Sequence, residues 1–356
     1  MNKLKEWISG HQVAAFFILT FIISWGLGFS WSAVLKRDQF LLLPLAFIAA
    51  CGPGIAGIII AAITNTQPRQ GPRRAFWIAF LVAWIVSALV CLANLKFIEQ
   101  FPLSIAVVGL FTIAVVPVAF VIASAYSRIP SVRNYLASLV QLRGVLGWSL
   151  LALVLFPALL LISFAISSLL NRQPIPAFQF PDFSLALIGL VMVKFLYQFF
   201  FFNATGEETG WRGFAMPRLQ TRTSPLIAAL VIAFFWVPWH LIGWEAEGKQ
   251  ILSLQYWIEM YIGHILLSVL IVWICNRANG SILVAGIAHA AMNTVQAFAP
   301  FGNMLFLVLS VAALVMILVD RMWKKLPPDH LAVYRESGMI KPEVGITKEI
   351  LEVSHV

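Results

Sequence analysis

Long apolar stretches dominate this sequence, and they limit what the chain can fold into. A stretch of about 20 residues with few charges has the length of a helix that crosses the hydrocarbon core of a bilayer. The sequence contains ten such stretches: 13–35, 41–63, 75–95, 104–126, 146–170, 183–202, 226–243, 251–275, 281–299 and 302–322. We therefore predict an all-α fold, a polytopic transmembrane helical bundle of about ten spans.

The composition excludes a soluble globular protein. Hydrophobic residues make up 61% of the 356 residues and charged residues only 11%, whereas soluble domains have about 45–50% apolar and about 25% charged residues. The net charge of +9 is spread between the apolar stretches and forms no single patch. We expect the lipid bilayer as a partner, and no nucleic acid.

The chain has no internal repeat, and no connecting segment is long enough for a separate domain. We expect N-terminal transmembrane helices of unassigned role in 1–182 and a region with the polar motifs in 183–299. A last span, 300–323, precedes a polar tail, 324–356.

Basic residues in short loops predict the orientation, because such loops stay on the cytoplasmic side. With a cytoplasmic N-terminus and an even number of spans, both termini and the segment 203–225 lie inside, and we expect this segment to be a loop. The site would then open toward the cytoplasm. The inside set is Lys3, Lys5, Arg69, Arg73, Arg74, Arg128, Arg133, Arg143, Arg212, Arg218, Arg222, Arg277, Arg321, Lys324 and Lys325, and the outside set is Lys36, Arg37, Lys96, Arg172 and Lys249.

Two adjacent acids and an arginine form the first polar motif, Glu207-Glu208-x-x-x-Arg212. Ionisable groups within a bilayer are costly, which makes them candidates for function. If the segment is helical, Glu208 and Arg212 share a face and form an ion pair, while Glu207 points elsewhere and stays available as a base. A solvated loop with an incidental salt bridge would give the same pattern.

Two further motifs follow within the apolar stretches. His240 closes the segment Trp236-Val237-Pro238-Trp239-His240, and His289 lies four residues before Asn293, which places both on one helix face. An imidazole can accept a proton or bind a metal, and an amide beside an imidazole can stabilise an oxyanion. Each motif alone is also compatible with simple hydrogen bonding between helices.

Lys194 lies within a predicted span and needs a partner. Glu259 is the candidate that we consider for this ion pair, with His264 about one turn further along its helix.

The order of the three motifs resembles the CPBP family of intramembrane proteases, also called Abi. This family includes CAAX prenyl endopeptidases and bacteriocin-processing or bacteriocin-immunity proteins. Gly210-Trp211-Arg212-Gly213-Phe214, Pro217-Arg218-Leu219-Gln220 and Gly280-Ser281-Ile282 also fit the family pattern, and the resemblance covers roughly 183–299. The family usually has phenylalanine where this chain has Trp236, and we expect that aromatic ring only to pack beneath the site.

The resemblance implies roles for six residues. Glu207 would activate water with help from His240, Glu208 would pair with Arg212, and His289 and Asn293 would face the oxyanion. Two mechanisms are equally compatible with these residues. In one, His240, His289 and Glu207 bind zinc, and in the other Glu207 and His240 polarise the water without a metal.

The function expected from the motifs is that of an endopeptidase in a bacterial-type cell membrane. Its substrate would be a membrane-anchored peptide or protein, with prenylated CAAX proteins as one class. Two alternatives stay open at this point. One is a non-catalytic scaffold or bacteriocin-immunity factor of the same fold, and the other is a transporter that uses the same polar residues as an ion path.

Overall fold

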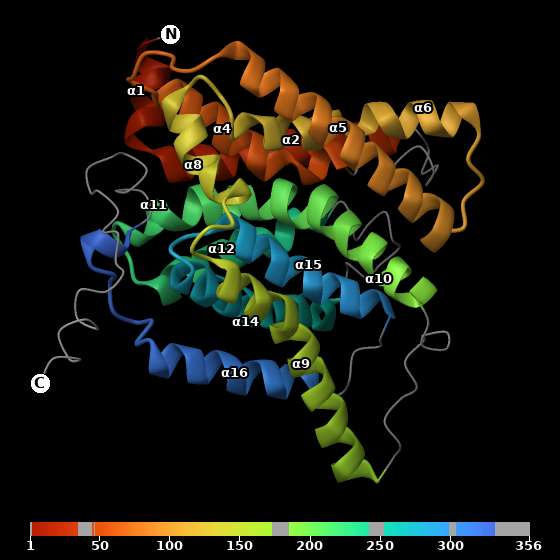
Figure 1. Ribbon diagram of the computed structural model, residues 1–356. Helices are drawn as coiled ribbons and strands as arrows, with labels where there is room; N and C mark the ends of the chain where they lie inside the picture. The colour runs from red at the N-terminus through yellow and green to blue at the C-terminus, as the bar shows by residue number, and fades with distance from the viewer. Residues whose placement is uncertain are drawn as a thin grey trace, which may run out of the picture.

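The computed structural model describes residues 2–34, 45, 47–172, 185–241, 253–298 and 304–331, and within these ranges every regular element is a helix (Figure 1). The all-α class predicted from the sequence is therefore confirmed. The elements are α1 (Asn2–Gly10), α2 (Gln12–Val34), α4 (Gly52–Thr64), α5 (Arg73–Ala93), η1 (Asn94–Ile98), α6 (Ile105–Ala114), α7 (Val116–Ser124), α8 (Pro130–Val140), α9 (Leu146–Asn171), α10 (Leu185–Gln198), η2 (Phe199–Ala215), α11 (Met216–Gln220), α12 (Pro225–Trp239), α14 (Leu254–Arg277), α15 (Ile282–Phe298), α16 (Leu305–Val319) and η3 (Pro328–His330).

Every one of the ten predicted stretches carries at least one of these helices. Among the described residues, five helices are long and apolar enough to cross a membrane, and α1 with α2, which meet at a bend of 107°, form a sixth if counted as one span. Shorter apolar helices occupy the other predicted stretches. The chain is thus an integral membrane protein, and the count of ten spans stays a prediction. The tail beyond residue 331, with Lys36, Arg37 and Lys249, lies outside the described residues.

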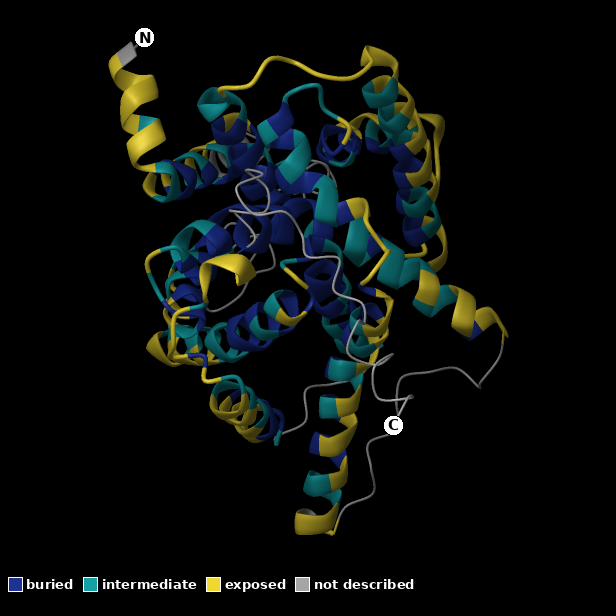
Figure 2. Ribbon diagram, turned by 60° about the vertical axis from the view of Figure 1, so that its left-hand side comes forward, coloured by how far each residue is buried: buried dark blue, intermediate teal, exposed yellow. Residues whose placement is uncertain are grey.

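The outer helices present apolar side chains to their surroundings, as a protein in lipid must. On α5, the side chains of Trp77, Ile78 and Leu89 are each more than half exposed. Figure 2 shows exposed residues on the outer faces of the helices and buried residues toward the middle of the bundle. The apolar surface that no soluble fold could hide therefore faces outward, where lipid would cover it.

One long helical segment, Leu185–Gln220, forms the middle of the bundle and consists of α10, η2 and α11. In Figure 1 it is the green ribbon between the N-terminal helices α2, α4 and α5 above and the C-terminal helices α12, α14 and α16 below. Its central part, η2, makes its most extensive contacts with α4 and α15. Helices from both halves of the chain therefore enclose the segment that contains Glu207 and Glu208.

The prediction of a loop at 203–225 is wrong, because this interval is helical as far as Gln220 and residues 203–215 are buried. Polar residues and three glycines gave the segment the composition of a loop. In the bundle, however, the helix satisfies the backbone hydrogen bonds that water would satisfy in a loop, and lipid cannot provide them. The two acids consequently lie inside the bundle, not in a connecting segment at its end.

Glycines explain how η2 packs so closely on α4. A Cβ atom added at Gly206 would lie 2.6 Å from the Ala50 carbonyl oxygen, and one added at Gly210 would lie 2.4 Å from Pro53 Cβ. Small residues four apart allow two helix backbones to approach within a membrane. Residues 1–182, to which the sequence assigned no role, thus supply the surface on which the polar segment rests.

Hydrogen bonds connect the basic loops to one another at one end of the bundle, the end of α8 and α11 in Figure 1. Each bond joins segments that the sequence places on the cytoplasmic side. The pairs are Gln70 with Arg128, Ser138 with Gly280, Arg277 with Asp320, Leu226 with Met322, and Arg218 with Gln12. We call this the basic end of the bundle.

Candidate active site

A π-helix positions the two acids of the first motif. The element η2 continues this geometry for 17 residues, although π-helices are usually single turns and often occur at functional sites. Asn203 and Glu207 are four residues apart on η2 and are hydrogen-bonded, and so are Glu208 and Arg212. The segment therefore presents two adjacent polar pairs to its neighbours.

Glu208 forms the ion-paired centre of the site, through its Oε1. Its Oε1 accepts a hydrogen bond from Arg212 Nη1 at 2.8 Å and lies 2.9 Å from Nδ1 of His289. The side chains of Glu208 and Arg212 are completely buried, and the guanidinium lies 4.5 Å from the centre of the Trp236 ring. The predicted ion pair is thus confirmed, and it extends to His289 on α15.

Glu207 forms a second centre with different partners. Its Oε2 accepts a hydrogen bond from the Trp236 indole Nε1 at 2.5 Å and faces His240 Nε2 at 3.8 Å. Its Oε1 lies 3.5 Å from the Asn203 amide nitrogen. No arginine or lysine forms a salt bridge with Glu207 within the described part of the chain. The two adjacent carboxylates therefore have distinct environments.

The tautomer of neutral His240 follows from its contact with the backbone. Its Nδ1 lies 2.9 Å from the carbonyl oxygen of Trp236, and because a carbonyl oxygen only accepts, Nδ1 carries the hydrogen. The other ring nitrogen, Nε2, is then an acceptor that faces Glu207 Oε2. At 3.8 Å, these two acceptors do not hydrogen-bond to each other.

The expectation that Trp236 only packs beneath the site is wrong, because its indole donates to Glu207. The Trp236 ring also contacts both imidazoles, with centroids 5.7 Å from His240 and 5.2 Å from His289. A phenylalanine at this position would keep the ring contacts and lose the hydrogen bond.

His289 and Asn293 lie one turn apart on α15 and line the same cavity, as their spacing predicted. The Asn293 amide nitrogen donates to Asn203 Oδ1 at 3.3 Å. Asn203 therefore connects Glu207 to Asn293, and sequence reasoning missed it. Its position four residues before Glu207 was the available signal.

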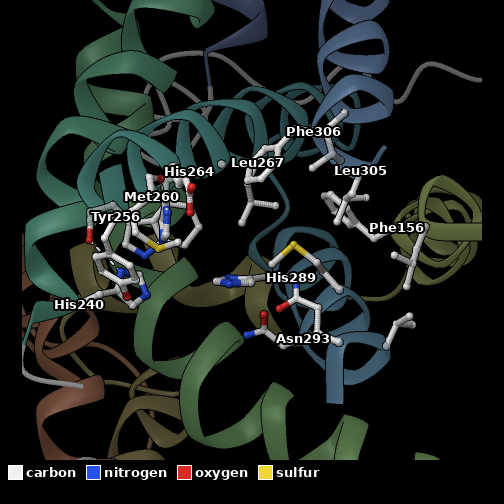
Figure 3. A pocket seen from close by; sticks show the side chains of 18 residues that line it. Phe156, His240, Tyr256, Met260, His264, Leu267, His289, Asn293, Leu305 and Phe306 are labelled. Atoms are coloured by element: carbon white, nitrogen blue, oxygen red, sulfur yellow. Dashed lines mark hydrogen bonds between the residues drawn. The ribbon is translucent and has the colours of Figure 1, made fainter. Parts of the chain in front are cut away.

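A cavity of about 450 Å³ adjoins these residues (Figure 3). Trp236, His240, His289 and Asn293 contribute to its lining, and in Figure 3 His289 and Asn293 point into the space between the two sides of the cavity. The other side is apolar. Its side chains come from α9, α14 and α16: Phe156, Leu160, Leu267, Leu305, Phe306 and Leu309.

His264 belongs to this site, although the motifs did not include it. Its ring lies 4.9 Å from that of His240 and 5.0 Å from that of Trp236, between centroids. The candidate pairing of Lys194 with Glu259 is not observed. Lys194 pairs with Glu99 at 3.3 Å, and Glu259 accepts a hydrogen bond from Gln255.

In this structure the candidate zinc ligands are not grouped around one point, and the zinc mechanism stays a prediction. Within the described ranges, no three histidine, cysteine, aspartate or glutamate side chains are grouped so that they could hold a metal ion. His289 Nδ1 contacts Glu208, and His240 contacts Glu207. The proposed ligands Glu207, His240 and His289 are thus divided between two centres, whereas a catalytic zinc needs three protein ligands around one point.

Comparisons with known proteins agree with the motifs. Residues 189–295 match a family model described as "Type II CAAX prenyl endopeptidase Rce1-like". A "CAAX prenyl protease 2" of Methanococcus maripaludis is 30% identical over 148 residues, which are 40% of this chain and 53% of that protein. The chain thus spans about half the length of this curated relative. The matched interval contains all six predicted site residues, and the resemblance predicted from the motifs is confirmed.

Proposed function

We propose that this chain is an intramembrane endopeptidase that hydrolyses a peptide bond in a membrane-associated protein or peptide. The observation that carries the proposal is the contrast between two adjacent carboxylates beside one cavity. Glu208 is neutralised by Arg212 at 2.8 Å, whereas Glu207 faces His240 across 3.8 Å. A carboxylate bound to a guanidinium is a poor base, and its neighbour beside an imidazole is a good one. The match to a prenyl endopeptidase model supports this chemistry.

The gap between Glu207 Oε2 and His240 Nε2 suits one water molecule. At 3.8 Å apart, both acceptors can receive a hydrogen from the same water. In the proposed step, the water oxygen bonds to the carbonyl carbon of the substrate while Glu207, assisted by His240, takes its proton. The proton then passes to the leaving nitrogen as the carbon–nitrogen bond breaks, which gives a carboxylic acid and an amine.

Asn293 and His289 are the proposed oxyanion donors. An amide has two N–H groups, and Asn293 uses one for Asn203, so the second can donate to the substrate carbonyl oxygen. His289, whose Nδ1 lies 2.9 Å from Glu208 Oε1, would be the second donor through its other ring nitrogen, Nε2. Donors fixed before the reaction stabilise the developing negative charge, typically by several kcal/mol.

The cavity supports a lipid-associated substrate. Its polar residues lie opposite an apolar wall within the bundle, and a substrate held by an anchor in the bilayer arrives already oriented. The relative's name, "CAAX prenyl protease 2", makes prenylated CAAX proteins one candidate class. Because the potential ligands do not form one metal site, no step of this proposal uses zinc.

The Glu207→Gln variant tests the proposal. Glutamine keeps the size of the side chain and removes its basicity, and loss of a general base typically costs about 10²- to 10⁴-fold in rate. We expect kcat for a lipidated fluorogenic peptide to fall by about this factor in purified protein that still unfolds cooperatively. The matched control is Glu6→Gln, an exposed acid on α1, which should leave the rate unchanged. Undiminished turnover of Glu207→Gln would defeat the assignment.

A further inference from the structure

Trp236 and His240 both contact Oε2 of Glu207, the proposed base. The indole of Trp236 donates to this oxygen at 2.5 Å, and His240 Nε2 faces it at 3.8 Å. Trp236 lies in the last turn of α12, and His240 directly follows that helix. Because helix ends fray, the positions of these two rings depend on contacts with neighbouring helices.

His264 provides such a contact from α14, the helix on which α12 packs most extensively. Its ring centroid lies 5.0 Å from that of Trp236 at an interplanar angle of 83°, and 4.9 Å from that of His240 at 63°. These are edge-to-face contacts, an arrangement that aromatic rings prefer. A single imidazole therefore contacts both groups that face the same carboxylate oxygen.

The ring of His264 is itself held by its own helix. Its Nδ1 lies 2.7 Å from the carbonyl oxygen of Met260, one turn earlier, and because a carbonyl oxygen only accepts, this nitrogen carries the hydrogen of the neutral ring. His264 is half-buried and lines the cavity. In Figure 3 it lies beside Met260, on the same side of the cavity as His240. The ring thus forms a fixed surface for its two neighbours.

We propose that His264 is a positioning residue, whose ring holds Trp236 and His240 in place against Glu207. The inference rests on the proposed function and deepens it, because it gives a role to a residue of α14 that the three motifs do not contain. His264 acts through its neighbours and transfers no proton itself. Misplacement by about 1 Å can cost about 10²-fold in rate, so loosely held rings would lower kcat without weakening substrate binding.

The variants His264→Ala and His264→Phe together test this role. Alanine removes the ring, and we expect kcat for the lipidated fluorogenic peptide to fall about 10- to 100-fold with little change in KM. Phenylalanine returns an aromatic ring to the same place and should restore most of the lost rate.

The matched control is His11→Ala. His11 is an exposed residue between α1 and α2, and it makes the same kinds of contact away from the site. Its ring stacks on that of Trp7, with centroids 5.4 Å apart, and its Nδ1 lies 3.0 Å from the Trp7 carbonyl oxygen. This variant should leave both kcat and KM unchanged.

Three results would overturn the inference. An unchanged kcat for His264→Ala would show that the ring is not needed. An equal loss in His264→Phe and His264→Ala would show that the reaction requires an imidazole nitrogen. A rise in KM at constant kcat would make His264 a substrate contact. His264→Leu, which fills the space without a ring edge, should behave like His264→Ala and replaces it if that variant does not unfold cooperatively in detergent.

A double variant separates positioning from a general loss of structure. If His264 acts on Glu207 through its two neighbours, adding His264→Ala to Glu207→Gln should lower the residual rate little further, because residues that act as a unit have non-additive effects. A loosened fold would instead lower the rate by the same factor in both backgrounds, and that result would contradict the inference.

The inference and the proposed function can fail separately. If Glu207→Gln abolishes cleavage while His264→Ala cleaves normally, only the positioning role is wrong. If Glu207→Gln cleaves normally while His264→Ala loses its rate, the assignment of Glu207 as the base fails, and the effect of His264 does not pass through that carboxylate.

Discussion

The two carboxylate centres of η2 differ in what surrounds them, although they are adjacent in the chain. The Glu208 centre is an ion pair with Arg212, joined by His289 and completely buried. At the Glu207 centre, the carboxylate accepts a hydrogen bond from Trp236 and faces His240, and both of these residues line the cavity. The arrangement around Glu208 is suited to stabilising the bundle, whereas the arrangement around Glu207 is suited to proton transfer. The comparison teaches that two carboxylates adjacent in the chain can have different electrostatic surroundings within one bundle.

The largest expected effect is on the free energy of unfolding, when the ion pair between Glu208 and Arg212 is removed. Glu208→Gln leaves the Arg212 charge buried without its partner, which typically costs about 3–5 kcal/mol. We expect the free energy of unfolding in detergent to fall by about this amount. Glu207→Gln is the matched control, since it makes the same change one residue away and should cost far less. Equal stability of the two variants would remove the distinction between the centres.

Asn293→Ala should lower kcat and leave the fold intact. Removing one oxyanion donor typically lowers kcat by about 10²- to 10³-fold, and Asn293 is partly exposed to the cavity. The rate of peptide cleavage at saturating substrate measures this effect. Gln296→Ala, another amide of α15 in the same cavity lining, is the control and should have little effect on kcat. If both variants behave alike, Asn293 is not the donor.

Trp236→Phe should weaken the Glu207 centre more mildly. The ring contacts remain, but Glu207 loses a hydrogen bond of the kind worth about 1.5–3 kcal/mol when the acceptor is charged. We expect kcat to fall roughly 10- to 100-fold. The control is Trp239→Phe, because Trp239 donates its indole hydrogen to Ser24 at 2.8 Å and not to a site acid. An unchanged rate for Trp236→Phe would show that the hydrogen bond from Trp236 does not affect the function of Glu207 as a base.

Metal removal should have the smallest effect. Because the candidate ligands are divided between the two centres, we expect dialysis against a chelator to leave peptide cleavage unchanged. The measurement is activity together with the zinc content of the same sample. Loss of cleavage that returns with added zinc would contradict this expectation. It would show that residues of both centres bind one zinc ion during the reaction.

Local regularities made parts of this protein predictable. Apolar stretches of helix length identified a membrane bundle, and the four-residue spacing of Glu208 and Arg212 predicted their ion pair. The same spacing predicted that His289 and Asn293 share a cavity-facing side of α15. In each case the interacting residues lie within one helix, where chain geometry alone fixes which side chains are neighbours.

Contacts between distant segments could not be predicted in this way. Lys194 pairs with Glu99, which lies 95 positions earlier in the chain, and Trp236 donates to an acid 29 positions earlier. The glycines of the first motif looked like loop residues until α4 was seen to pack against them. Such contacts depend on which helix surfaces meet, and a single sequence does not encode that choice in any local pattern.

The sequence by itself determined that the chain lies in a membrane, that it is helical and which six polar side chains form the motifs, because hydropathy and helical spacing are local properties. Only the tertiary structure decided which carboxylate is neutralised, which donors surround the other, and that His264 belongs to the site. These features arise from helices that are far apart in the chain, and packing alone brings their side chains within hydrogen-bonding distance.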